Sequence, residues 1–165
     1  ETFLALGDLI QQGKVRYIGC CNFKGHLLVD AMHVAKNLGV PQFISVQNFY
    51  NILRRDVEDE RLAAARFAGV GFLPYFPLAS GMLTGKYDPT APTSKPPKGS
   101  RAPLKDNSLF NRAFPPTTFE TPATPRTHCH PCGESLVGFE FLSVLNRQAV
   151  TSGLAGPRPQ RQAQS

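Results

Sequence analysis

A strand followed by a glycine-punctuated loop is the part of this sequence best suited to chemistry. Residues 74–87, PYFPLASGMLTGKY, begin with apolar and aromatic side chains and reach a Gly-Lys pair just before their end. Glycines let the backbone approach a ligand closely, free N–H groups can point at an anion, and a lysine adds a positive charge. The pattern is neither a Walker loop nor a dinucleotide fingerprint, so it indicates phosphate binding only in general terms.

Two further blocks precede this loop, at the spacing of alternating strands and helices. They are GKVRYIGCCNF, residues 13–23, and SVQNFYNILRRDVEDE, residues 45–60. Together the three blocks resemble the aldo-keto reductase family, in the branch that also includes the potassium-channel β subunits. This family consists of NADP-dependent (β/α)8-barrel oxidoreductases, and the resemblance extends from about residue 4 to residue 101. It implies an α/β fold: an incomplete (β/α)8 TIM barrel, the C-terminal half, with a long Pro-rich irregular segment.

The elements that position these blocks alternate between helix and strand over residues 1–87. Apolar residues at helical spacing predict one helix that ends at Gly13 and a second that ends at Gly39. A third helix is predicted from an N-cap at Asp56 to Gly69, with Leu62, Ala65 and Phe67 on its inner face. Strands are predicted at residues 15–20, 43–47 and 70–75. Such alternation favours parallel strands in βα units.

Beyond residue 87 the composition changes. Ten of the fifteen prolines lie between Pro89 and Pro131, where helix and central strand are both disfavoured. Residues 88–131 are therefore predicted to be mostly irregular, with a helix returning at 136–145 and a short strand at 150–154. This gives three parts: a partial barrel at 1–101, an irregular and disordered Pro/Thr-rich segment at 102–133, and a remnant of the last barrel helix and strand at 134–165.

The resemblance assigns the nicotinamide end of a cofactor to five residues. Cys21 and Asn22 match the pair that binds the carboxamide, although the family has serine where this chain has Cys21. Gln47 matches a glutamine that contacts the same group, and Tyr75 matches the aromatic residue that stacks on the ring. Phe76 stands where a serine is usual. Judged from the residues alone, Asn22 and Gln47 could also be polar residues that simply end their strands.

The phosphate end of the cofactor falls on the following loops. The resemblance places pyrophosphate and adenosine-phosphate contacts on Leu78, Gly81, Gly85, Lys86, Arg101, Gly156 and Arg158. With the nicotinamide residues, these positions imply NADP(H) as the cofactor. For the charged side chains the alternative is solvated surface charge, which is the usual place of lysine and arginine.

The family reduces an aldehyde or ketone with hydride from NADPH, and a tyrosine donates the proton with help from a lysine, an aspartate and a histidine. None of these four matches a residue of this chain. At 165 residues the chain is also shorter than the about 250 of a complete barrel. We therefore expect the cofactor-binding half of a carbonyl-reducing enzyme, inactive alone and prone to self-association through its open sheet edges. The alternatives are a non-catalytic interaction protein of the same fold and the product of a truncated gene model.

Four potential metal ligands lie within the five residues 128–132; they are His128, Cys129, His130 and Cys132. Zinc accepts these side chains, but ligands so close together do not easily surround one tetrahedral ion. We predict no metal site.

Charge and hydropathy narrow the possible partners. The formal net charge of +6 is spread along the chain, without a basic run, so no nucleic-acid partner is predicted. We find no signal peptide and no apolar run of transmembrane length, which favours a cytoplasmic protein without a membrane partner. The four cysteines are expected to be free thiols.

Overall fold

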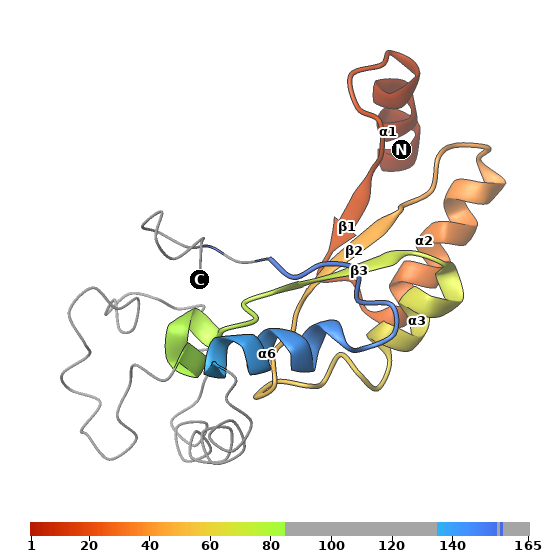
Figure 1. The fold of residues 1–165 in the computed structure, drawn as a ribbon. Coiled ribbons are helices and arrows are strands. Elements are labelled where there is room, and N and C mark those ends of the chain that lie inside the picture. Colours follow the sequence, from red (N-terminus) through yellow and green to blue (C-terminus); the bar gives the residue numbers. More distant parts are fainter. Residues whose placement is uncertain (85–134, 155, 157–165) are drawn as a thin grey trace, which may run out of the picture.

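The computed structural model describes residues 1–84, 135–154 and 156 of the chain (Figure 1). Helix and strand alternate through the first 75 residues, as the sequence predicts, and the later described residues form a 3-10 helix and an α-helix. In chain order the elements are α1 (Thr2–Gln11), β1 (Gly19–Cys21), α2 (Gly25–Asn37), β2 (Ser45–Phe49), α3 (Arg61–Ala68), β3 (Gly71–Tyr75), the 3-10 helix η1 (Ala79–Thr84) and α6 (Leu136–Leu145).

The three strands form one parallel sheet in the order β1-β2-β3. Cys21 pairs with Gln47 in register, and Gln47 pairs with Leu73. The fourth strand, expected at residues 150–154, is reduced to a single parallel bridge between Val150 and Phe72. The α/β class and the parallel strands are confirmed, and the small sheet is consistent with part of a (β/α)8 barrel.

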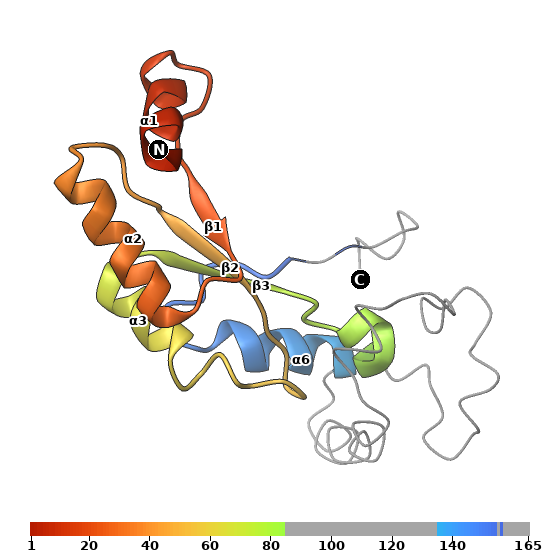
Figure 2. The ribbon, with the colours of Figure 1, turned by 180° about the vertical axis from the view of Figure 1, so that it is seen from behind.

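One face of the sheet carries the hydrophobic core. Val46 of β2 and Phe72 of β3 are buried, and they cluster with buried residues of α2, α3 and α6. Alternate strand residues point to the opposite face, and Gln47 and Tyr75 are only half-buried there. Leu73 lies on that face too. Figures 1 and 2 show the same elements from the front and from behind.

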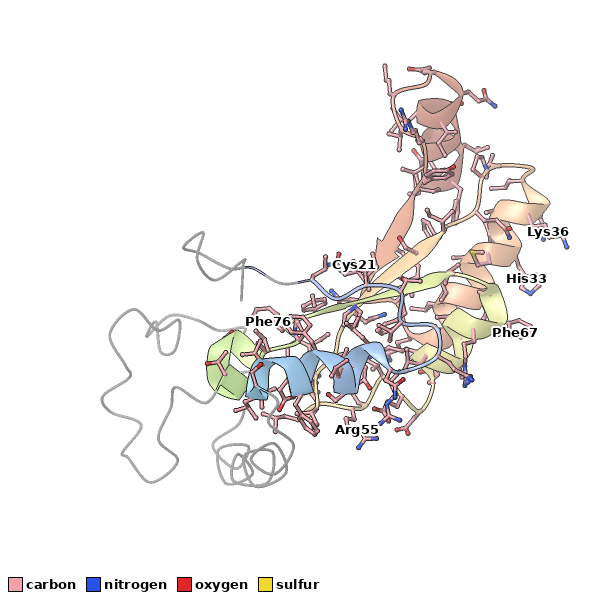
Figure 3. All side chains as sticks on the ribbon, viewed as in Figure 1. Cys21, His33, Lys36, Arg55, Phe67 and Phe76 are labelled. Carbon is pink, nitrogen blue, oxygen red and sulfur yellow. The ribbon has the colours of Figure 1, made fainter. Side chains whose placement is uncertain are left out.

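Helix α3 differs from its prediction at both its start and its buried face. It begins at Arg61, with Glu60 rather than Asp56 at the N-cap position. The Asp56 carboxylate instead accepts hydrogen bonds from Arg54 Nε at 3.2 Å and from Arg61 Nη1 at 3.0 Å. Phe67, expected on the inner face, is 79% exposed and points outward (Figure 3). Ala65 is buried two positions earlier, about half a helical turn away, so both residues cannot face the core.

Helix α3 ends where the sequence predicts, whereas the bounds of the first two strands differ from their prediction. Gly69 follows α3 with a φ of 66°, the left-handed conformation that glycine adopts without strain, as predicted. Strand β1 begins at Gly19 rather than at Val15, and β2 continues to Phe49, two residues beyond its predicted end. Gln47, predicted to end its strand, therefore lies inside β2.

The helices are short. The longest one among the described residues, α2, has 13 residues, and none in that part of the chain has the length and apolar character needed to cross a bilayer.

Candidate functional site

Three of the predicted site residues meet at the carboxyl edge of the sheet. Parallel strands end on the same side, so the residues that end or follow β1, β2 and β3 come together. The backbone N–H of Asn22 donates to the carbonyl oxygen of Gln47 at 2.8 Å. The hydroxyl of Tyr75 donates to Asn22 Oδ1 at 2.8 Å. Asn22, Gln47 and Tyr75 therefore form one connected group.

The amide groups of this edge retain hydrogen-bonding capacity. Within the described residues, neither the Gln47 side-chain amide nor Asn22 Nδ2 has a hydrogen-bond partner. A carboxamide needs both a donor and an acceptor opposite it, and a glutamine amide presents both. Asn22 has a φ of 60°, which asparagine tolerates better than most residues. These groups fit the carboxamide of a nicotinamide ring.

Aromatic side chains surround Tyr75. Its ring lies 5.5 Å from Phe49 in an edge-to-face arrangement, and Phe76 stacks on Phe49 at 5.6 Å. The guanidinium of Arg54 lies 4.9 Å from the centre of the Phe49 ring, a cation–π contact. These rings and the hydrogen bond to Asn22 together fix the orientation of the tyrosine.

The two cysteines of β1 point to opposite faces. Burial and, to a smaller extent, the nearby Cys21 together raise the pKa of the Cys20 thiol to about 11, so Cys20 stays protonated at neutral pH. Cys21 is exposed and lies beside Gln47 in the sheet register. Its thiol is a weaker hydrogen-bonding group than the hydroxyl that the family has there.

The loop after β3 adopts unusual backbone conformations. Ala79, Ser80 and Gly81 all have positive φ angles, of 48°, 58° and 95°. Successive residues in such conformations can form a concavity of N–H groups that suits an anion. The Gly81 N–H, however, donates to the half-buried Leu78 at its carbonyl oxygen, at 2.8 Å. This N–H is therefore not available to a phosphate in the conformation seen here.

Most of the remaining predicted positions lie outside the described residues. The described residues include the exposed Gly156 but not Gly85, Lys86, Arg101, His128, Cys129, His130, Cys132 or Arg158. Over residues 1–84, 135–154 and 156 there is no group of three or more metal-ligating side chains.

A polar network supports the loop between β2 and α3. The Tyr50 hydroxyl donates to Glu58 Oε1 at 2.6 Å, and Arg55 donates to both carboxylate oxygens at 2.8 and 2.7 Å. The hydrogen bonds from Arg55, with that from Tyr50, lower the pKa of Glu58 to about 2. Burial, and then Glu58, raise the pKa of Tyr50 to about 12. Tyr50 thus helps to hold this loop in place through its hydrogen bond to Glu58.

Sequence reasoning missed the detailed role of Asn51. This residue is completely buried, and its Nδ2 donates to the carbonyl oxygen of Phe76 at 3.0 Å. The turn-forming character of asparagine is visible in sequence, whereas a partner 25 positions away is not.

Comparison with known proteins shows the family of this chain. The family model for the aldo/keto reductase family matches residues 1–128, beyond the end of the recognisable motifs at residue 101. A putative aryl-alcohol dehydrogenase of Schizosaccharomyces pombe is 39% identical over 88 residues, which are 53% of this chain and 27% of that protein. The aldo-keto reductase dtxS3 of Metarhizium robertsii is 43% identical over 83 residues, 50% of this chain and 22% of that protein.

A third relative aligns with nearly all of the chain. The uncharacterized oxidoreductase YrpG of Bacillus subtilis is 30% identical over 158 residues, 96% of this chain and 45% of that protein. The chain thus spans less than half the length of each of these three relatives. Because the family model matches more than half of the sequence and the parallel α/β sheet agrees with it, the chain belongs to the aldo/keto reductase family.

Proposed function

We propose that this chain supplies the nicotinamide-binding part of an NADP-dependent oxidoreductase that interconverts a carbonyl compound and an alcohol. The observation that carries the proposal is the connected group of Asn22, Gln47 and Tyr75 at the carboxyl edge of the sheet. Members of this family generally use NAD(P)H, which supplies or accepts the hydride. The residues of this chain bind and orient the nicotinamide; we assign no proton donor to them.

Each side chain of the group has a distinct part in the proposal. The Gln47 amide and Asn22 Nδ2 hydrogen-bond the carboxamide, while the Tyr75 hydroxyl keeps Asn22 Oδ1 occupied and the amide correctly turned. The tyrosine ring provides an aromatic surface for the nicotinamide. The preference for NADP(H) rests on the sequence match of Arg158 to a contact of the 2′-phosphate, and Lys86 is matched to the pyrophosphate.

An aromatic alcohol or aldehyde is the substrate class with most support. The fission yeast relative is named a putative aryl-alcohol dehydrogenase. In this chain Phe49 and Phe76 place two further rings next to Tyr75, which suits an aromatic substrate. The alternative of a non-catalytic interaction protein rests on the sequence motifs alone.

We expect the affinity for NADPH to follow the order parent, Tyr75→Phe, Tyr75→Leu. Phenylalanine retains the ring but loses the hydrogen bond to Asn22, which should weaken binding by about fivefold. Leucine loses the ring as well, so about tenfold or more is expected. Removing the charge in Lys86→Ala should cost about 1–3 kcal/mol of binding free energy. The measurement is a titration followed by the fluorescence of the reduced nicotinamide.

Tyr17→Leu is the matched control for these variants. Tyr17 is 69% exposed and precedes β1, away from the carboxyl edge of the sheet. This variant should bind NADPH as the parent does. A parent that binds no nucleotide, or a Tyr75→Leu variant that binds as tightly as the parent, would refute the proposed function.

We further propose that the chain self-associates. Among residues 1–84, 135–154 and 156, strand β1 has a sheet neighbour on one side only, and the face that carries Gln47, Leu73 and Tyr75 contributes no residue to the core cluster. Unpaired strand edges readily pair with another chain. Size-exclusion chromatography with light scattering should show a dimer or larger species, in reductant as well, which excludes a disulfide through Cys21. A monomer that melts cooperatively would contradict this expectation.

A further inference from the structure

Asn51 is completely buried just after β2, and both polar atoms of its side-chain amide make hydrogen bonds. Its Oδ1 accepts the backbone N–H groups of Leu53 and Arg54, each at 3.0 Å. Its Nδ2 donates to the carbonyl oxygen of Phe76 at 3.0 Å. The Arg54 N–H also donates to the Asn51 carbonyl oxygen, at 3.0 Å, and closes a tight turn. The amide is thus fixed by the turn after β2 and reaches across to the end of β3.

A second hydrogen bond joins the same two segments as the bond from Asn51 Nδ2 to Phe76. The backbone N–H of Tyr50 donates to the carbonyl oxygen of Tyr75 at 3.2 Å. Two consecutive residues, Tyr50 and Asn51, therefore hold two consecutive carbonyl groups, those of Tyr75 and Phe76. These two hydrogen bonds, made by residues of the loop that follows β2, fix the position of the backbone at the end of β3.

The held segment is strained. Phe76 has a φ of 59°, in the left-handed region that bulky side chains rarely adopt. Such a conformation persists only where the surroundings impose it. The Phe76 carbonyl oxygen accepts from Asn51 Nδ2 and from the Ala79 N–H at 3.0 Å, and these two bonds fix the bend. The bend directly follows Tyr75, whose ring contacts Phe49 and whose hydroxyl reaches Asn22.

We propose that Asn51 is a positioning residue, whose hydrogen bond to Phe76 maintains the bend that directs the Tyr75 ring to Asn22. The importance of this orientation for nucleotide binding rests on the proposed function. The positioning itself can be measured without nucleotide.

Asn51→Asp at pH 8 isolates the donated hydrogen bond. An ionised aspartate still accepts from Leu53 and Arg54 but cannot donate to Phe76. Asn48→Ala is the matched control, because Asn48 is also buried in β2 and its Nδ2 has no hydrogen-bond partner in the described part of the chain. Circular dichroism establishes which variants are folded.

The readout is the fluorine NMR spectrum of protein labelled with fluorotyrosine. The Tyr75 resonance is assigned from its loss in Tyr75→Phe, and the exposed Tyr17 is the internal reference. Asn51→Asp should displace or broaden the Tyr75 resonance and leave that of Tyr17 in place, whereas Asn48→Ala should leave both. An unchanged Tyr75 resonance in a folded Asn51→Asp protein would overturn the proposal.

A second pair of variants covers the case in which Asn51→Asp does not fold. Glycine adopts a φ near 60° without strain, so Phe76→Gly removes the backbone strain that the Asn51 hydrogen bond offsets. Asn51→Ala should therefore be better tolerated in the Phe76→Gly background than alone. If it unfolds the chain equally in both backgrounds, Asn51 does not act through the bend and the proposal fails.

Nucleotide titration then separates this inference from the proposed function. Loss of the Asn51 hydrogen bond should weaken NADPH binding by about tenfold, the equivalent of one ordinary buried hydrogen bond. If the parent binds no NADPH but the Tyr75 resonance moves as expected, the proposed function is wrong and the positioning role stands. If the resonance moves and NADPH binds equally well to parent and variant, the link from Asn51 to nucleotide binding is refuted.

Discussion

Phe72→Ala is expected to lower the free energy of unfolding by about 3–5 kcal/mol, the usual effect of removing a buried phenylalanine. Phe72 is completely buried in β3, in register with Val46 on one side and Val150 on the other. Its ring packs edge-to-face on Tyr50 at 6.3 Å. Alanine would leave a cavity where these elements meet. Urea denaturation followed by circular dichroism measures the change.

Phe67→Ala supplies the matched control for that experiment. The side chain of Phe67 is 79% exposed on α3, so its removal should change the free energy of unfolding by less than about 0.5 kcal/mol. The residue type and the substitution are the same, and only burial differs. Equal losses in the two variants would show that β3 does not lie at the centre of the core.

Glu140→Gln is expected to stabilise the chain at pH 8 and to leave its stability almost unchanged at pH 4.5. Glu140 in α6 is completely buried, and neither carboxylate oxygen has a hydrogen-bond partner among the residues that the structure describes. Burial raises the pKa of this group from 4.5 to about 7. The folded parent therefore retains a proton that the unfolded chain has lost between these two pH values, and its stability falls as the pH rises through them. Above pH 7 the loss of unfolding free energy reaches about 3 kcal/mol.

The measurement is the difference between the unfolding free energies of variant and parent across pH 4.5 to 8. Other titrating groups cancel in this difference. It should grow with pH up to about 7 and then level off. Asp30→Asn, at an exposed position of α2, removes a carboxylate without burial and should give a nearly flat difference. A flat curve for Glu140→Gln would mean that the carboxyl is solvated in the folded chain.

The sequence predicts the helices and strands best where apolar spacing and glycine act together. Helix α2 ends close to Gly39 and α3 ends at Gly69, because these glycines adopt left-handed conformations. The start of α3 was predicted incorrectly, since side-chain pairs of Asp56 with Arg54 and Arg61 replace a helix cap. Such pairs depend on the three-dimensional path of the loop.

The sequence predicts that three candidate residues lie close together but does not predict how they contact one another. Asn22, Gln47 and Tyr75 come together because parallel strands end at one edge, which the sequence already indicates. The contacts between them, and the support of Phe76 by Asn51, join positions far apart in the chain. Local residue patterns carry no information about such partners.

The bridge between β3 and the last described residues has a consequence for the order of folding. Thr151 Oγ1 donates to the Phe72 carbonyl oxygen across 79 positions of sequence, whereas β2 and β3 pair across 26. Closing a longer loop costs more chain entropy, so the local βα units have a kinetic advantage over the late segment. Helix α6 and the residues after it should therefore be the last part of the chain to dock and the first to detach in brief openings of the folded state.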